Sequence, residues 1–403
     1  MHRVAITGLG CISALGHDAN SHWRSAVEGI SGIGPITAIP PEKLKIHVAA
    51  EVKGFDAEKH FDPVKLAVID PYSQYALVAA REAIADSGLT FDHGLHDDTA
   101  VIIGTGIGGA KTINEDSERI FGQGKIRTPP MSIPKLMPSA AASQVTMEYG
   151  LNGPAFGVTS ACSSANHAIG EAYWMIKSGR ARAAVTGGSE ACLVFGSMLG
   201  WQALRVLSVD TCRPFCIDRK GMVLGEGAGV LVLERLEDAQ ARGARIYAEI
   251  AGMGMTSDAG SLTDPSAEGA ARAIRQALDE AEIAPEGLHY INAHGTGTGQ
   301  NDVAETKAIH LALGEAASQV AVSSTKSMHG HGLGAAGALE AVITARAIAD
   351  QIAPPTANFT MADPECDLDY IPNAARSMTI DTALSNSFAF GGLNAVLAFR
   401  RLH

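Results

Sequence analysis

The order of strand-like and helix-like segments occurs twice along the chain, and this repeat constrains the fold more than any other feature. Five segments of the first half match five of the second half in the same order. The matching pairs are HRVAITGLG with RIYAEIAGMG, 75–88 with 270–282, 100–109 with 289–299, 158–163 with 322–327, and 225–235 with 390–400. We therefore predict two copies of one strand–helix unit, joined near residues 240–244.

Alternation of strands with helices predicts mostly parallel sheets covered by helices. Two such halves packed through their helices would form an α/β fold of five layers, α/β/α/β/α, with halves at residues 1–242 and 243–403. In HRVAITGLG and RIYAEIAGMG the strand is expected to end in a glycine turn, and the closing strand of each half to be an antiparallel edge. Segments 109–140 and 188–219 have no counterpart, which predicts a cap over the site or a subunit interface.

Composition narrows the classes of function. The chain has 403 residues, 46% hydrophobic and 18% charged, and a net charge of −12, which is typical of a globular protein and excludes a basic nucleic-acid surface. Segment 149–170 lacks charged residues, but its Gly, Pro, Ser and Asn argue against a membrane span. The six scattered cysteines and a start that leads directly into a strand predict free thiols in a reducing cytoplasm.

A cysteine stands where a strand of the first half turns into a helix. Cys162 follows the run 158–161 and precedes apolar residues at helical spacing. Backbone N–H groups at a helix start favour a thiolate and can lower its pKa below the usual value of about 8.5. Cys162 is thus a candidate nucleophile, and an inert buried thiol is the alternative.

The second half carries the other reactive side chains. An apolar strand leads to His294 in a Gly/Thr turn, and Lys326 and His331 stand in a glycine-rich turn before a helix. Ligands of open α/β sheets bind at the carboxyl ends of strands, so these side chains are expected to converge with Cys162. The alternative for His294 is a capping role satisfied by the backbone.

Several neighbouring residues have two interpretations. Glu305 follows His294 on an expected helix and either pairs with Lys326 or is a solvated helix charge, while Asp302 lies near the start of that helix. His329 is interpreted as a solvated loop residue. Nothing completes a zinc ligand set for the histidines, so no metal site is predicted.

Two aromatic residues border glycines before the last strand. Phe388 and Phe390 in SFAFGG suit a gate, and ordinary core packing of Phe388 is the alternative. One cysteine, two histidines and a lysine at converging strand ends fit covalent acyl transfer through a thioester. Two neutral imidazoles would stabilise an enolate, and backbone N–H groups of Cys162 and Phe390 would form an oxyanion hole.

Four motifs resemble the β-ketoacyl-(acyl-carrier-protein) synthases of the elongating type, the 3-oxoacyl synthase II family. They are TSACSSANHAIG, NAHGTGTGQND, STKSMHGHGLGAAGALE and NSFAFGGLNA. The resemblance covers essentially the whole chain. It implies a thiolase fold, a homodimer, an acyl carrier protein as partner, and decarboxylative condensation of a Cys-bound acyl group with a malonyl carrier. No separate cofactor is implied, because the phosphopantetheine of the carrier holds the substrates.

The resemblance also implies roles for single residues. Cys162 would carry the acyl group, His294 and His331 would serve the malonyl thioester, and Lys326 would tune the charge near them. The remaining roles are the gate (Phe390), contact with the phosphopantetheine arm or malonyl group (Thr296 and Thr298), the acyl pocket (Ile107), a further substrate contact (Phe388) and support (Glu305 and Asp302).

The sequence departs from the family pattern in places. Leu393 and His329 each replace the usual Thr, and in this detail, as in MPSAAASQV and ACSSANHAIG, the chain resembles the nodulation protein E group. The gate reads FAFGG instead of FGFGG, and Ala389 is expected to stiffen it, because glycine alone reaches positive φ freely. The carrier-docking helix reads Leu66-Ala67-Val68-Ile69 after Lys65, where basic residues are usual. Candidate carrier contacts elsewhere are Arg205, Lys125 and Arg127.

Two other functions stay open at this point. A thiolase acting on coenzyme A would not decarboxylate its substrate, and the paired His294 and His331 argue against it, since thiolases are expected to use a second cysteine as base. A non-catalytic partner subunit of the chain-length-factor type is disfavoured by the intact Cys162.

Overall fold

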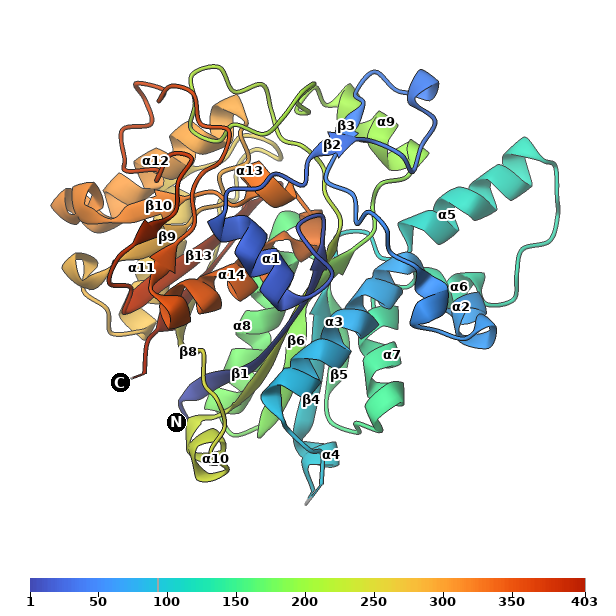
Figure 1. The fold of residues 1–403 in the computed structure, drawn as a ribbon, viewed down its shortest axis with the longest axis horizontal. Coiled ribbons are helices and arrows are strands. Elements are labelled where there is room, and N and C mark those ends of the chain that lie inside the picture. Colours follow the sequence, from blue (N-terminus) through green and yellow to red (C-terminus); the bar gives the residue numbers. More distant parts are fainter. Residues whose placement is uncertain (93, 403) are drawn as a thin grey trace.

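The computed structural model describes residues 1–92 and 94–402, and the repeat seen in the sequence is visible in its order of elements. In the first half three strand–helix pairs followed by two strands form the framework (Figure 1). They are β1 (Val4–Ser13), α3 (Pro71–Ser87), β4 (Thr99–Gly104), β5 (Ala155–Val158), α8 (Ser164–Lys177), β6 (Ala183–Glu190) and β7 (Gly227–Arg235), with α7 (Ala140–Tyr149) before β5.

The second half repeats this order. Its framework consists of β8 (Ala248–Ser257), α11 (Ala267–Glu280), β9 (Tyr290–Asn292), α12 (Gly299–Leu313), β10 (Ala321–Ser323), α14 (Ala336–Asp350), β13 (Thr382–Ala389) and β14 (Leu393–Arg400). Each half begins its first long helix after a capping side chain: Asp70 accepts a hydrogen bond from the N–H of Tyr72 before α3, and Ser266 from that of Gly269 before α11. The predicted boundary at residue 242 falls between α10 (Leu236–Ala241) and β8.

The strands form one ten-stranded sheet in the order β10-β9-β13-β14-β8-β1-β7-β6-β4-β5. In each half three strands are parallel: β5, β4 and β6 in the first, and β10, β9 and β13 in the second. The other two strands of each half pair antiparallel: β7 and β1 in the first half, and β14 and β8 in the second. Both halves therefore have one topology, which confirms the predicted duplication.

The closing strands β7 and β14 are antiparallel as expected, but the prediction that they are edges is wrong. Each lies between two partners, and the edges of the sheet are β5 and β10. The two halves are joined because β1 and β8 pair antiparallel from Val4↔Ile250 to Ile6↔Ala248. The short and buried pairing of β1 with β8 makes one sheet out of the two copies.

The expectation of glycine turns after the first strand of each half is also wrong. Gly8 and Gly10 lie inside β1, and Gly252 and Gly254 lie inside β8. A Cβ atom on Gly10 would stand 1.9 Å from the carbonyl oxygen of Ala79 in α3, and one on Gly254 would stand 1.9 Å from that of Ala273 in α11. The repeated glycines thus allow a helix to lie directly on the strand.

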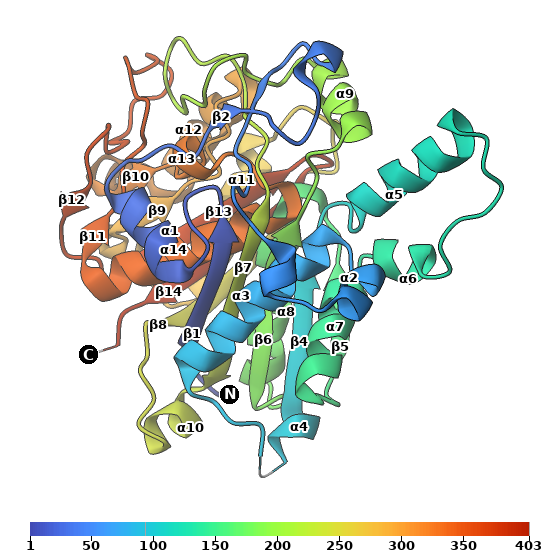
Figure 2. The ribbon, with the colours of Figure 1, turned by 45° about the vertical axis from the view of Figure 1, so that its right-hand side comes forward.

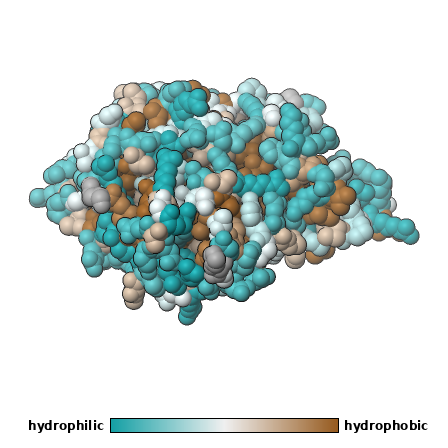
Figure 3. All heavy atoms as spheres, turned by 60° about the horizontal axis from the view of Figure 1, so that its bottom comes forward, coloured by the Kyte–Doolittle hydropathy of each residue, from teal (hydrophilic) through white to brown (hydrophobic). Residues whose placement is uncertain are grey.

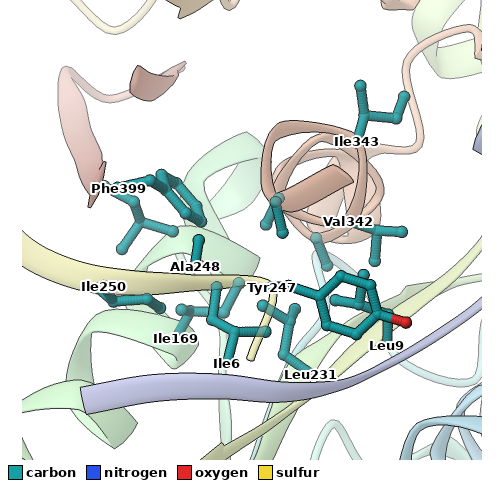
Figure 4. Close-up of a cluster of buried hydrophobic side chains, with 14 of the residues drawn as sticks. Ile6, Leu9, Ile169, Leu231, Tyr247, Ala248, Ile250, Val342, Ile343 and Phe399 are labelled. Carbon is teal, nitrogen blue, oxygen red and sulfur yellow. The ribbon is translucent and has the colours of Figure 1, made fainter. Parts of the chain in front are cut away.

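Helices and sheet halves alternate in five layers (Figures 1 and 2). Helices α3 and α7 cover one sheet half, α11 and α12 cover the other, and α8 and α14 lie between the two halves. Figure 4 shows the buried centre, where Ile6 of β1, Ile250 of β8, Ile169 of α8 and Val342 of α14 pack together. These four residues are completely buried. The predicted α/β/α/β/α arrangement is confirmed.

The remaining elements surround this framework. Helices α5 (Ala110–Ser117) and α6 (Ser132–Leu136) form an arm that projects from the body in Figures 1 and 2, while α9 (Phe195–Ala203) lies above the sheet. The other short elements are α1 (Ala19–Val27), α2 (Pro63–Val68), α4 (Leu95–Asp98), α13 (Lys326–His329), β2 (Gly34–Pro35), β3 (Val48–Ala49), β11 (Ile352–Ala353) and β12 (Arg376–Ser377). Most of the face in Figure 3 is hydrophilic, with smaller hydrophobic areas between polar groups. Among the described helices, none combines the length and apolar character needed to span a bilayer.

Candidate active site

The candidate nucleophile lies at the junction that the sequence predicts. After β5 the chain makes a short 3-10 turn, Ala161–Ser163, and continues as α8. Ala161 has a φ of 51°, in the left-handed region, which costs a non-glycine residue about 1–2 kcal/mol. This turn directs the side chain of Cys162 into the interior, where it is 7% exposed. Strain next to a buried thiol is typical of a functional site.

Two histidines from the second half lie next to this thiol. Nε2 of His331 is 3.1 Å from Sγ of Cys162. The ring of His294 packs edge-on against the His331 ring, with 5.4 Å between centroids and an interplanar angle of 85°. One ligand atom from each of the three residues lies within 4.8 Å of the others. The carboxyl ends of strands from both halves therefore bring these side chains together, as the sequence predicts.

The expected lowering of the Cys162 pKa is wrong for the free protein. Burial raises the pKa of the thiol to about 11, although the positive charge of Lys326 and the backbone N–H groups of Phe390 and of Cys162 itself act in the opposite direction. Removal of the thiolate from water outweighs these stabilising contacts. At neutral pH the resting side chain is therefore mostly a thiol.

Both histidines are neutral at physiological pH. Burial lowers the pKa of His294 well below its ordinary value, and the charge of Lys326 and the proximity of the His331 ring lower it further. Burial and Lys326 do the same to the pKa of His331. A neutral imidazole can donate a hydrogen bond from one nitrogen, so both rings can act as uncharged donors in the cavity.

The partner of the buried lysine is Glu340 of α14, and the prediction that Glu305 pairs with Lys326 is wrong. Nζ of Lys326 donates a hydrogen bond to Oε1 of Glu340, and both side chains are completely buried. Burial raises the pKa of Glu340, whereas its contact with Lys326 lowers it. The ion pair holds one positive charge behind the two histidines.

Glu305 and Asp302 support the turn that carries His294 instead of pairing with Lys326. Glu305 is buried, not solvated as the alternative interpretation held, and accepts hydrogen bonds from the N–H of His294 at 2.8 Å and of Gly295 at 2.7 Å. Asp302 accepts from the N–H of Gly297 at 3.1 Å. Both carboxylates therefore fix backbone geometry near the histidine.

His329 is buried, so its interpretation as a solvated residue is wrong. It has no exposed surface, and its Nε2 lies 3.0 Å from Oγ1 of Thr325. Its ring is 5.9 Å from that of His22, a buried histidine of α1. The two rings form a polar cluster behind the site, separate from the Cys162 cavity.

A cavity of about 320 Å³ opens above the thiol. Its lining includes Cys162, His294, His331, Thr296, Thr298, Phe388 and Phe390, which the sequence singles out, together with Trp201, Leu204 and Leu262. The hydroxyl oxygens of Thr296 and Thr298 lie 2.9 Å apart. Leu204 and Leu262 are 50% and 73% exposed, so the cavity reaches the surface there.

The aromatic gate residues take different positions. Phe388 is in β13, buried, and packs at 66° to the His294 ring, so it belongs to both core and cavity. Phe390 lies in the turn after β13 and stacks on Trp201 of α9, with 5.9 Å between ring centroids. Gly391 and Gly392 have φ values of 85° and 68°, whereas Ala389 pairs with Leu393 at the end of the strand. The positions that need positive φ have therefore kept glycine.

Ile107 does not line the Cys162 cavity. It lines an adjacent, mainly apolar cavity of about 550 Å³ between α5 and α9, which shares Trp201 and Leu204 with the first. Trp201 therefore stands at the boundary between the two cavities.

The candidate carrier contacts are all exposed. Arg205 follows Leu204 at the cavity mouth, while Lys125 and Arg127 lie on the projecting arm. In α2, Leu66 and Val68 pack against a hydrophobic cluster under α3, and Ile69 is buried. Leu66, Val68 and Ile69, which stand where basic residues are usual, therefore contact the protein interior and not solvent alone.

Four residues with a role at the site were not identified from the sequence. Oγ of Ser163 donates to the carbonyl oxygen of Leu393 at 2.6 Å, and Nδ2 of Asn166 donates to that of Ser385 at 3.1 Å, so the nucleophile helix is attached to the β13–β14 hairpin. Glu340 and Trp201 are the others. A lone glutamate in the apolar helix AAGALEAVITA is the signal that could have identified Glu340.

Comparisons with known proteins agree with this geometry over the full length. Residues 1–239 match the model of the beta-ketoacyl synthase N-terminal domain, and residues 247–360 match the C-terminal domain. The fold and the two matched domains thus define a condensing enzyme of the thiolase fold. The chain belongs to the β-ketoacyl synthase family and is an acyltransferase.

Particular relatives cover nearly all of the chain. Nodulation protein E of Rhizobium sp. (strain N33) is 48% identical over 400 residues, 99% of each chain. The 3-oxoacyl-[acyl-carrier-protein] synthase 2 of Staphylococcus aureus (strain COL) is 45% identical over 406 residues, 99% of this chain and 98% of the relative. A crystal structure of a beta-ketoacyl synthase from Burkholderia phymatum STM815 superposes with a TM-score of 0.93 at 35% identity, covering both chains completely.

Proposed function

We propose that this enzyme condenses an acyl group held on Cys162 with a malonyl group on an acyl carrier protein, releasing CO₂ and a β-ketoacyl carrier. The observation that carries the proposal is the 3.1 Å contact between Nε2 of His331 and Sγ of Cys162, with the His294 ring against the same imidazole. A nucleophile with two uncharged donors beside it suits a reaction in which negative charge develops on sulfur and then on oxygen.

In the first step the sulfur of Cys162 attacks the acyl thioester of the carrier. The bond between Sγ and the acyl carbon forms as the carrier sulfur leaves, and the thiol proton ends on the departing carrier thiol. Because the resting thiol pKa is raised by burial, a donor from Nε2–H of His331 stabilises the thiolate as it forms. Backbone N–H groups of Cys162 and Phe390 would receive the transient oxyanion.

In the second step the malonyl group loses its carboxylate as CO₂, and the electron pair of that bond becomes an enolate. Donors from His294 and His331 would stabilise the enolate oxygen while its carbon attacks the acyl thioester. The Cys162 sulfur leaves as a thiolate and takes up a proton from solvent. Neutral donors suit this step, because they stabilise the enolate without protonating it.

Lys326 acts through the two histidines, because its positive charge disfavours the charged form of their imidazole rings. Burial is the main reason that the pKa of both histidines is low, and the Lys326 ammonium lowers it further. Glu340 fixes that ammonium in the interior. We propose that the Lys326–Glu340 pair, together with burial, maintains the two imidazoles as hydrogen-bond donors.

The cavity mouth suits a substrate delivered on a flexible arm. Thr296 and Thr298 offer hydroxyl groups along the cavity wall to an amide-containing phosphopantetheine. Arg205, at the mouth, is a cation that an acidic carrier could contact, with Lys125 and Arg127 as further candidates on the arm. A ketosynthase in complex with its acyl-carrier protein superposes with a TM-score of 0.92 at 35% identity.

We also propose a homodimer. The arm around α5 and α6 exposes large apolar side chains that a monomer would leave in water, among them Ile113, Phe121 and Ile133. Edge strand β5 lies on the same side of the molecule. A second copy that covered this region would bury the exposed apolar side chains and protect the unpaired edge strand.

The acyl chain is expected to pass from Cys162 toward the apolar cavity of Ile107, with Trp201 as the boundary. Trp201→Ala should open this boundary and raise the ratio of kcat/KM for long over short acyl carriers by about tenfold, a change that a few methylene contacts can produce. Trp201→Phe is the matched variant and should change the ratio much less. Competition between acyl carriers of two lengths, followed by mass spectrometry, measures the ratio. An unchanged ratio in Trp201→Ala would place the acyl chain elsewhere.

The function as a whole is tested by supplying an acyl carrier and a malonyl carrier to the purified enzyme. We expect equal amounts of CO₂ and β-ketoacyl carrier, and no reaction when acetyl-coenzyme A replaces the malonyl carrier. Condensation without malonyl would indicate a thiolase. Complete inactivity with normal folding would indicate a partner subunit.

A further inference from the structure

The Cys162, His294 and His331 side chains have the composition of a metal site as well as of a catalytic site. One sulfur and two imidazole nitrogens lie within 4.8 Å of one another. Within residues 1–92 and 94–402, no other group of three His, Cys, Asp or Glu residues shows this approach of ligand atoms. The combination of thiolate and neutral imidazole is the donor set that Zn²⁺ prefers.

The distances also suit a tetrahedral ion. Zn–S bonds of about 2.3 Å and Zn–N bonds of about 2.0–2.1 Å place the ligand atoms of a tetrahedral site about 3.3–3.6 Å apart. The Cys162–His331 pair at 3.1 Å would open slightly, and the pairs within 4.8 Å would close by side-chain rotation. The fourth position would face the cavity and take a water molecule.

Both histidines are already in the form that binds a metal. Burial and the charge of Lys326 keep them neutral, so each ring binds a metal once its single N–H proton lies on Nδ1, which has no other hydrogen-bond partner among the described residues. The cavity gives an ion a route from the surface past Leu204 and Leu262.

We propose that Cys162, His294 and His331 form a binding site for a thiophilic divalent cation, with Zn²⁺ as the best match, and that its occupation reversibly inhibits the enzyme. Binding replaces the thiol proton: the Zn–S bond forms as the S–H bond breaks, and the proton leaves to solvent. No electron transfer is involved. The inhibition rests on the proposed function, because the metal would occupy the sulfur that has to accept the acyl group, whereas the binding itself does not.

The surroundings predict an exchangeable ion rather than a structural one. In structural zinc sites the second nitrogen of each histidine usually donates to a fixed partner. Here Nδ1 of His294 and of His331 has no hydrogen-bond partner among the described residues. The buried ammonium of Lys326 also repels a cation, while its partner Glu340 and the buried Glu190 offset part of that repulsion. A chelator should therefore remove the ion without unfolding the protein.

The experiment measures binding separately from turnover. We expect calorimetry of the metal-free enzyme with ZnCl₂ to give one site per chain with release of about one proton, and Co²⁺ to give a thiolate-to-metal absorption band. Both signals should disappear in Cys162→Ser and weaken at least tenfold in His294→Ala. Cys366→Ala, which removes a buried thiol outside the cluster, should bind like the wild type, and Mg²⁺ should not compete.

Activity provides the second readout. ZnCl₂ should inhibit condensation and protect Cys162 from iodoacetamide, and EDTA should restore both activity and alkylation. Equal Zn²⁺ binding by wild type and Cys162→Ser, or absence of a thiolate–Co²⁺ band, would overturn the metal site. Zn²⁺ binding by a protein that does not condense carriers would instead overturn the proposed function and leave the site intact.

Discussion

Cys162→Ala should lower condensation by a factor of at least about 10⁴, because no other side chain can form the acyl thioester in this cavity. The sulfur is buried in contact with His331, and the backbone N–H groups that would hold the oxyanion are arranged around it. Intact-protein mass spectrometry after incubation with an acyl carrier should show one acyl group on the wild type and none on the variant.

Cys366→Ala serves as the control, because it removes a thiol that is also buried but lies in the core of the second half. It should keep both the acyl adduct and condensation. Product formation by Cys162→Ala at the wild-type rate would show that the acyl group is carried elsewhere.

Lys326→Met should destabilise the protein by about 3–5 kcal/mol, because it leaves the carboxylate of Glu340 buried without a cation. Both partners are inaccessible to water, so solvent cannot replace the lost contact. Urea unfolding followed by circular dichroism measures the change in free energy. A loss below about 1 kcal/mol would mean that Glu340 is protonated and that the pair carries no charge.

The double variant Lys326→Met/Glu340→Leu separates stability from catalysis. It should regain most of the stability, since apolar groups can replace a buried ion pair, but not the activity. Because Lys326 lowers the pKa of His294 and His331, its removal raises them toward their ordinary value. The histidines then become charged on acidification at a higher pH, so kcat should fall earlier than in the wild type as pH decreases. An unchanged pH profile in the double variant would contradict the proposed role of Lys326.

The sequence predicted the architecture well because its repeat is a property of segment order. The five layers and the common topology of the halves follow from strands and helices that alternate twice. The position of β7 and β14 inside the sheet did not follow, because pairing partners distant in sequence decide it. The glycines of β1 and β8 were misinterpreted because close approach of a helix and a turn both require glycine.

At the site, the sequence identified reactive residues that stand in a distinctive local pattern. It did not identify the side chains that these residues contact. Cys162 and His294 each follow a strand and His331 stands in a glycine-rich turn, and all three have small neighbours, which is visible locally. Glu340 lies 14 residues after Lys326, on the next helix, and only the turn between α13 and α14 brings the two side chains together. Burial of His329 likewise depends on α1, which approaches from the far end of the chain.

In the repeat, the segment 158–163 aligns with 322–327, so Cys162 and Lys326 occupy equivalent positions of the two copies. Each follows the third strand of its half and precedes the helix of the central layer. One backbone junction, used twice, thus presents a nucleophile in one copy and a permanent charge in the other. The two copies share a backbone but carry different reactive side chains at equivalent positions. Two identical first halves would lack the lysine and the histidines, and two identical second halves would lack the nucleophile.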